Sequence, residues 1–176
     1  MATGRAAGRR VSVDLRDPGV SAAEVLAALG LAAHPEGGHY RETWRDVPEG
    51  GGRGAGTAIL FVLAAGERSR WHRVDGAELW LWQAGAGLAL GISEDGVGAR
   101  EVRLGPDVGA GEALQGVVPA MAWQDARSLG AWTLVSCVVV PAFRFEGFEM
   151  APEGWAPEGS MGSAQTRKGS EDPLIP

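Results

Sequence analysis

The side chains best suited to chemistry lie on two predicted β-strands that follow each other between residues 66 and 85. His72 belongs to the first strand and Glu78 to the second, with Asp75-Gly76 at the turn between them. An imidazole changes its charge near neutral pH, and a neighbouring carboxylate can orient it and tune its pKa. If both side chains point into one cavity, they form an acid–base site or part of a metal site.

The length of this turn decides whether the two side chains meet. A two-residue hairpin makes Glu78 point away from His72. A three-residue loop pairs Val74 with Glu78 and directs both side chains into one cavity. Alternation along the first strand places Arg70 and Val74 on the face of His72. Apolar residues occur on both faces of the second strand, so this pattern leaves both registers open.

The rest of the chain predicts a single β-rich domain. Twenty-eight glycines and ten prolines among 176 residues indicate frequent turns and short strands. Strands spaced by about ten residues are typical of a sandwich or barrel. The expected strands cover residues 38–45, 56–64, 68–74, 78–83, 86–93, 98–104, 113–118, 121–127, 131–140 and 144–150.

One helix is predicted ahead of the strands. Ser21 and Glu24 match a capping box, in which each side chain bonds the backbone of the other residue. Apolar residues follow at helical spacing, and Gly30 stands where a left-handed C-cap belongs. The expected helix covers residues 21–29. The chain then divides into a flexible leader at residues 1–20, one folded domain at 21–150 and a mostly disordered tail at 151–176.

Two of the predicted strands are apolar on both faces, at residues 57–63 and 132–140. A strand in a simple two-layer sandwich has one polar face, so these runs require a second cover. The helix or another copy of the chain can supply it. We expect a homodimer with the strand at residues 56–64 in the interface.

Composition excludes several classes of partner. The net charge of -6 argues against a nucleic-acid surface, which needs clustered basic residues. No apolar run approaches the roughly 20 residues that span a bilayer. Cys137 is the only cysteine, so an intrachain disulfide is excluded and a cytoplasmic location is expected.

Two motifs resemble those of the cupin superfamily. The first cupin motif has a glycine, two histidines one residue apart, a glutamate and a closing glycine. The corresponding residues here are Gly66, His72, Val74, Glu78 and Gly85, so Val74 replaces the second histidine. The second motif is matched by Pro119-Ala-Met-Ala-Trp-Gln124, with Met121 in place of a glycine and Gln124 in place of the last histidine.

Four further phrases are similar to one small branch, the cupin type-five family, which consists mostly of domains of unknown function. They are His34-Pro-Glu-Gly-Gly38 with Tyr40-Arg-Glu42, Ser69-Arg-Trp-His-Arg73, Val118-Pro119 and Trp123-Gln124. The resemblance implies an all-β jelly-roll barrel (a double-stranded β-helix) with one short N-terminal helix, assembled as a homodimer. It also implies that His72 and Glu78 point into the barrel, which selects the three-residue loop.

A metal is not the favoured cofactor. A cupin metal cage usually offers three imidazoles and a carboxylate, whereas only His72, Glu78 and Gln124 remain here. If a divalent metal binds, these three residues are its expected ligands. Otherwise no cofactor is expected.

The favoured function is proton transfer on a sugar-like or carbonyl substrate by a metal-independent isomerase, epimerase or lyase-like enzyme. Metal-free cupins that epimerise sugar nucleotides work from a comparable histidine–carboxylate pair. His72 and Glu78 are the expected catalytic residues. The alternatives are a non-catalytic module that binds a small ligand and a metal-dependent dioxygenase.

Further residues are expected to bind the ligand. Gln124 would orient a hydroxyl or carbonyl, and Arg70 would receive an anionic group or join an ion-pair network with Arg41 and Glu42. The remaining candidates are Tyr40 and the cavity-wall residues Trp80, Trp82 and Trp123. The turn at 34–38 is expected to be structural, with a loop over the barrel mouth as the alternative.

Overall fold

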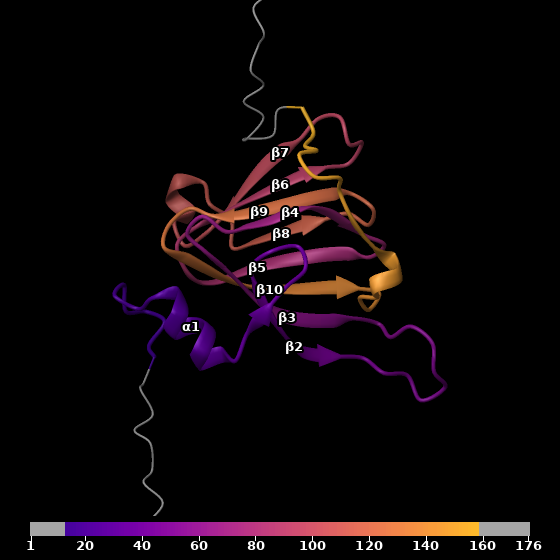
Figure 1. Ribbon diagram of the computed structural model, residues 1–176, viewed down its shortest axis with the longest axis horizontal. Coiled ribbons are helices and arrows are strands. Elements are labelled where there is room, and N and C mark those ends of the chain that lie inside the picture. Colours follow the sequence, from indigo (N-terminus) through magenta and orange to yellow (C-terminus); the bar gives the residue numbers. More distant parts are fainter. Residues whose placement is uncertain (1–12, 159–176) are drawn as a thin grey trace, which may run out of the picture.

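The computed structural model describes residues 13–158, which form two antiparallel β-sheets that face each other and one α-helix beside them (Figure 1). The six-stranded sheet contains, in spatial order, β1 (Ala32–Ala33), β2 (His39–Arg45), β3 (Thr57–Ala64), β10 (Trp132–Val140), β5 (Ala77–Gly85) and β8 (Gln115–Val118). The five-stranded sheet contains β11 (Phe148–Met150), β4 (Arg68–Val74), β9 (Trp123–Ser128), β6 (Leu88–Ser93) and β7 (Arg100–Leu104). Two 3-10 helices, η1 (Val108–Ala110) and η2 (Phe145–Gly147), lie in the connections. The expected all-β class with one short helix is confirmed.

The helix α1 (Ala22–Leu29) begins and ends where the sequence predicts. Ser21 caps the backbone of Glu24, and the Glu24 side chain bonds back to Ser21. Gly30 ends the helix at φ 62, in the left-handed region. Val25 is fully buried, because this face of the helix packs on the outside of β3 and β10. Within residues 13–158, no helix is long and apolar enough to cross a membrane.

Apolar side chains fill most of the space between the sheets. Phe61 and Val135 come from the six-stranded sheet, and Leu90 comes from the five-stranded sheet. Burying a large side chain of this kind contributes about 1.5–3 kcal/mol. The core therefore fixes the spacing of the two sheets, and any polar residue that points inward must find its partners there.

The strands that carry His72 and Glu78 do not pair with each other, so the expectation of a hairpin or a three-residue loop between them is wrong. β4 pairs with β9 and β11, whereas β5 pairs with β8 and β10. Residues 75–76 therefore cross from one sheet to the other. Hairpin register does not decide whether the two side chains meet, because they approach each other from opposite sheets.

Parts of the expected leader and tail contact the domain. Val20 accepts a hydrogen bond from the indole of Trp132 at 2.7 Å. At the other end, the Ala151 amide donates to the Trp71 carbonyl, and the Trp155 ring packs on Trp71. The remaining leader and tail, residues 1–12 and 159–176, lie outside the described residues.

A tight turn at residues 34–38 docks on β4. The amide of Gly37 donates to the His34 carbonyl, and the amide of His34 donates to the Gly38 carbonyl. The Arg70 amide donates to the carbonyl of Glu36 at 2.9 Å. Gly37 has φ 110, and a Cβ atom there would overlap the carbonyl of Arg68. Only glycine allows the turn to approach the strand this closely.

Gly37→Ala should therefore destabilise the domain by about 1–3 kcal/mol or more, through backbone strain and overlap with β4. Urea denaturation measures the loss. Gly30→Ala is the matched control, because Gly30 also has positive φ but a Cβ atom there meets nothing within 4 Å. Equal losses for the two variants would contradict the close approach of the turn to β4.

Candidate functional site

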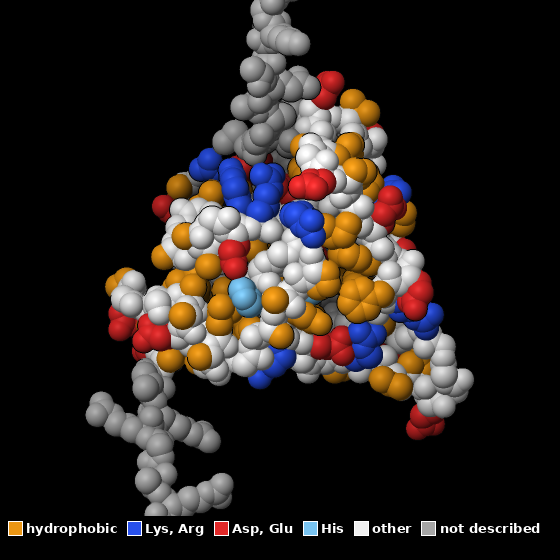
Figure 2. Space-filling model, viewed as in Figure 1, with side chains coloured by type: hydrophobic (Ala, Val, Ile, Leu, Met, Phe, Trp, Pro, Cys, Tyr) orange, Lys and Arg blue, Asp and Glu red, His pale blue; other side chains and the backbone are white. Residues whose placement is uncertain are grey.

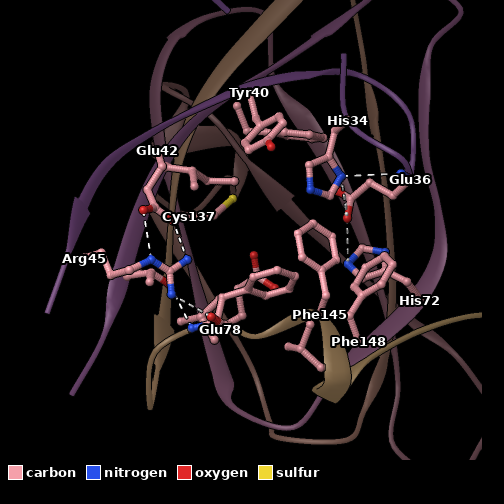
Figure 3. Close-up of a pocket in the computed structure, with 16 residues that line it drawn as sticks. His34, Glu36, Tyr40, Glu42, Arg45, His72, Glu78, Cys137, Phe145 and Phe148 are labelled. Carbon is pink, nitrogen blue, oxygen red and sulfur yellow. Dashed lines mark hydrogen bonds and ion pairs between the residues drawn. The ribbon is translucent and has the colours of Figure 1, made fainter. Parts of the chain in front are cut away.

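One cavity lies between the two sheets and receives both His72 and Glu78 (Figure 3). Its volume of about 90 Å³ exceeds several-fold the roughly 10–15 Å³ that one water needs, so it can hold a compact ligand. Its lining combines four groups of residues: the acids Glu36, Glu42 and Glu78; the bases His34, Arg45 and His72; the aromatic Tyr40, Phe61, Phe143, Phe145 and Phe148; and Thr57, Ile59, Val74, Cys137 and Val139.

A β-bulge in β4 sets which side chains face the cavity. Ser69 pairs with Ala126 and His72 pairs with Gln124, so three residues of β4 match two of β9. Ser69 and His72 consequently both point inward, and Arg70 is exposed. The expectation that Arg70 shares the face of His72 is wrong, because the bulge shifts the alternation by one residue.

Glu36 is the central polar residue of the cavity, although the sequence analysis read its turn as structural. Its Oε1 accepts a hydrogen bond from the Ser69 hydroxyl at 2.8 Å. Its Oε2 lies 3.3 Å from Nδ1 of His34 and 3.3 Å from Nε2 of His72. Figure 3 shows Glu36 joined to both imidazoles. The turn thus brings a carboxyl group between two histidines.

The hydrogen bonds of His72 indicate which of its nitrogens can exchange a proton. Nδ1 lies 2.8 Å from the Arg70 carbonyl, which can only accept, so Nδ1 carries a hydrogen. Nε2 faces Glu36. On the other side of Glu36, Nδ1 of His34 accepts the Glu36 amide at 3.4 Å. Nε2 of His72 and Nδ1 of His34 thus both act as acceptors, and both face Oε2 of Glu36. A proton on this carboxyl oxygen can be donated to either nitrogen.

Glu78 enters the cavity from β5 and is held by a buried amide. The Gln124 side chain donates to Oε2 of Glu78 at 2.6 Å, and its own oxygen accepts the indole hydrogen of Trp80 at 2.9 Å. Gln124 and Trp80 are both buried and do not line the cavity. Their place is behind Glu78, where they fix its orientation.

Burial shifts the pKa of each of these groups in the direction that favours its neutral form. Desolvation raises the pKa of Glu36 to about 8 and that of Glu78 to about 7. Desolvation, with a smaller contribution from His72, lowers the pKa of His34 to about 4. Desolvation also lowers the pKa of His72, against the opposing attraction of Glu78. Near neutral pH the carboxyl groups are thus the main carriers of exchangeable protons.

The other predicted ligand-binding residues divide between the cavity and other surfaces. Tyr40 lines the cavity, with its ring centroid 4.6 Å from that of His34. Trp82 lies at another surface, where its indole donates to the Ala86 carbonyl. Trp123 stacks outside the barrel with Arg73, at 4.6 Å.

The two predicted arginines also lie away from the cavity. The Arg70 guanidinium donates to the Pro35 carbonyl at 2.7 Å, so it clamps the turn at 34–38. Arg41 is exposed and does not line the cavity. The arginine at the cavity is instead Arg45, which donates to Glu42 through two nitrogens and to the carbonyl of Phe143.

Sequence reasoning missed a group of phenylalanines that follow β10. Phe143, Phe145 and Phe148 line the cavity and contact one another, with centroids 5.1–6.2 Å apart. The sequence carried no spacing signal for them, because their ring positions depend on a 3-10 helix and a short strand. Glu36 did carry a signal: an acid between His34 and two glycines in a turn.

The sequence model of the cupin-superfamily family DUF985 matches residues 23–151 of the chain. The chain belongs to this cupin family. The family is one of unknown function, so membership confirms the predicted resemblance and leaves the activity open.

Solved structures similar to this cupin have the same fold. A hypothetical protein from Leishmania major is 30% identical with a TM-score of 0.69, over 77% of this chain and 90% of its own. A Shewanella oneidensis protein is 31% identical with a TM-score of 0.71, over 75% of this chain and 85% of its own. Bacillus subtilis oxalate decarboxylase is 13% identical with a TM-score of 0.52, over 67% of this chain and 29% of its own. That last likeness shows the fold alone. No curated protein matches the chain.

The second cupin motif keeps its backbone shape without its usual residue. Met121 stands at the glycine position and has φ 66, in the left-handed region that favours glycine. Its amide donates to the Val74 carbonyl at 2.7 Å, which joins the two motifs. The turn before β9 is therefore preserved, and Gln124 follows at the position of the missing histidine.

The three metal-ligand candidates of this cupin do not fit a metal. Both polar atoms of the Gln124 amide are already bonded, to Trp80 and to Glu78. The position of the second motif histidine is the apolar Val74, which lines the cavity. Among residues 13–158, no group of three or more His, Cys, Asp and Glu side chains is arranged to hold a metal ion.

The raised pKa of Glu78 predicts that Glu78→Gln changes the pH dependence of stability. A carboxyl group whose pKa is higher in the folded than in the unfolded state stabilises the fold most below its unfolded value of 4.5, and this contribution is lost as pH rises through about 7. A glutamine has no proton to lose. The stability of the variant relative to the original chain should therefore increase from about pH 5 to about pH 8, by on the order of 2–3 kcal/mol.

Urea denaturation at the two pH values measures this difference. Glu94→Gln is the control, because Glu94 is exposed and does not line the cavity. A stability difference for Glu78→Gln that does not change with pH would contradict the burial of Glu78 as an unionised carboxyl.

Proposed function

We propose that this cupin binds a compact polar molecule in the cavity and moves a proton to or from it, as an isomerase, epimerase or lyase-like enzyme acting on a carbonyl or sugar-like compound. One observation carries the proposal. The Glu36–His72 pair and Glu78 reach one cavity from its two sides, and all three residues are buried. Two proton-exchanging groups across a small space are what a stepwise proton transfer needs.

The roles follow from the hydrogen bonds. His72 keeps its Nδ1 hydrogen on the Arg70 carbonyl, so Nε2 accepts a proton from the carbon next to a substrate carbonyl. The electron pair of the broken C–H bond moves to the carbonyl oxygen, which Glu78 protonates. Return of the proton from His72 to the other face of the same carbon, while the enol O–H proton goes back to Glu78, gives the epimer. In a hydroxycarbonyl substrate, delivery of that proton to the former carbonyl carbon, while Glu78 takes the proton of the neighbouring hydroxyl, gives the isomer.

The neighbouring residues act as positioning residues. Glu36 positions the His72 ring, because its Oε2 lies 3.3 Å from Nε2. Gln124 holds Glu78 through the 2.6 Å hydrogen bond from β9. A pKa of about 7 lets Glu78 give and take a proton near neutral pH, which is the condition for an efficient general acid.

Deuterium exchange tests the reaction. The chain is incubated in D₂O with dihydroxyacetone, hydroxyacetone and aminoacetone, and mass spectrometry follows incorporation beside the carbonyl. We expect protein-dependent exchange of at least one compound. His72→Gln and Glu78→Gln should each slow exchange by at least about a hundredfold, because each removes a proton carrier.

Binding measurements separate an enzyme from a binding module. In an enzyme, Glu78→Gln should keep ligand affinity within about tenfold while exchange is lost. Trp123→Phe is the control, since this ring lies outside the barrel and should leave exchange unchanged. A compound that binds by calorimetry and never exchanges would overturn the enzymatic proposal in favour of a non-catalytic module.

We also propose that two copies pair through the outer face of the six-stranded sheet. Helix α1 covers only one part of this face, around Val62 and Leu134. Apolar side chains remain partly or fully exposed elsewhere on it, namely Leu79, Leu81, Val117, Val138 and Val140. These residues carry no charge, so this part of the face can pack on its own copy without burying an unpaired charge. The exposed Arg41 lies on β2, opposite Leu60.

Leu81→Glu should dissociate this dimer, because it places a charge on the apolar face next to Leu79. Light scattering coupled to size-exclusion chromatography measures the mass. Leu129→Glu is the matched control, since Leu129 is an exposed leucine in the loop after β9. A monomeric mass for the original chain, or a dimer that survives Leu81→Glu, would contradict the proposal.

A further inference from the structure

The charged residues that line the cavity are unevenly balanced. Three carboxyl groups face it, from Glu36, Glu42 and Glu78, whereas Arg45 is the only arginine or lysine among its lining residues. Arg45 is already bound: it donates to both oxygens of Glu42 and to the Phe143 carbonyl. Figure 3 shows this pair at one side of the cavity. Glu78 therefore has no cationic partner apart from an imidazole, and the one arginine that acts on Glu36, Arg70, does so from outside the cavity lining.

The imidazoles do not supply that charge near neutral pH. Burial lowers the pKa of His34 to about 4 and lowers the pKa of His72 as well. The cavity stays near neutral because its carboxyl groups keep protons, as their raised pKa values indicate. An anionic ligand would thus be desolvated without a cation to pair with, which is unfavourable.

Aromatic rings form the other part of the lining. Phe143, Phe145 and Phe148 meet edge to face, and the ring of Phe148 lies 5.4 Å from that of His72. Phe145 is 58% exposed, so this group reaches the surface. Figure 2 shows hydrophobic side chains gathered over the segment that follows β10. Aromatic faces attract organic cations, most strongly where water is excluded.

We infer that the ligand of this cavity is a compact organic cation, an amine or quaternary ammonium, whose charged group lies between the carboxyl groups of Glu36 and Glu78 and the phenylalanine rings. The inference rests on the proposed function, because it assigns a substrate class to the same cavity. The cavity volume of about 90 Å³ limits the charged part to a few non-hydrogen atoms. Oxalate, the substrate named for the distant structural neighbour, has the opposite charge.

A pair of isosteric probes tests the charge. Choline and 3,3-dimethylbutan-1-ol have the same shape, and only choline is charged. Isothermal titration calorimetry of the full chain, in an amine-free buffer at about pH 8, should give choline about tenfold higher affinity than the neutral alcohol, and no binding of oxalate. Equal or tighter binding of the alcohol, or binding of oxalate, would overturn the inference.

Two variants locate the charged group. Glu78→Gln should reduce the preference for choline over the alcohol to less than about threefold, because it removes a carboxylate but keeps the side-chain shape. Phe145→Leu should weaken choline by about threefold and leave the alcohol nearly unchanged. Glu94→Gln should change neither, and thermal unfolding confirms that each variant is folded. A choline preference that survives both cavity variants would place binding elsewhere.

The affinity for choline should also rise with pH, by about tenfold between pH 6 and pH 9, because the cation competes with the protons on the carboxyl groups. The groups that face the cation come from every element around the cavity: Glu36 and His34 from the turn, His72 from β4, Glu78 from β5, Cys137 from β10, and Tyr40, Glu42 and Arg45 from β2. A pH-independent affinity would contradict competition at these carboxyl groups.

Failure of the cationic ligand class and failure of the proposed proton transfer give different experimental results. Exchange of dihydroxyacetone or hydroxyacetone, which are uncharged, together with no choline preference, would remove the cationic substrate class and leave the proton transfer. Choline binding of the expected kind without exchange of any carbonyl compound would leave the ligand class and remove the catalysis.

Discussion

The contact between Glu36 and His72 is the interaction on which the site depends. A carboxyl group buried in an apolar cavity is costly unless its oxygens are bonded. Here one oxygen accepts the Ser69 hydroxyl, and the other lies between two imidazoles. The same apolar walls raise the pKa of Glu36 and lower that of His72, so the acid holds the shared proton at neutral pH. The contact exists only because the turn at 34–38 lies directly on β4, at a separation that requires glycine at position 37.

The family and its similar structures identify the scaffold rather than the reaction. The cupin-superfamily match covers the whole sandwich, whereas the oxalate decarboxylase likeness is 13% in sequence. Function resides in the site that a fold carries. In this chain the motif positions hold Val74 and Gln124, and the cavity residues outside the motifs supply a carboxyl group and the phenylalanines.

Local sequence signals predicted most of the elements. The capping box at Ser21 and Gly30 set the bounds of α1, and turn residues located the strands to within a few positions. The motif spacing also indicated that His72 and Glu78 share a cavity. These features depend on neighbouring residues along the chain, on hydrogen bonds within one element or on a family resemblance, so the sequence alone determined them.

Tertiary structure decided which other residues join that pair. The bulge in β4 turned Arg70 outward, and the crossing of residues 75–76 put β4 and β5 in opposite sheets. The docking of a distant turn brought Glu36 to His72, and the segment after β10 brought the phenylalanines. These contacts join residues far apart in the sequence, and a one-residue shift reverses the face of a strand side chain, so local pattern could not fix them.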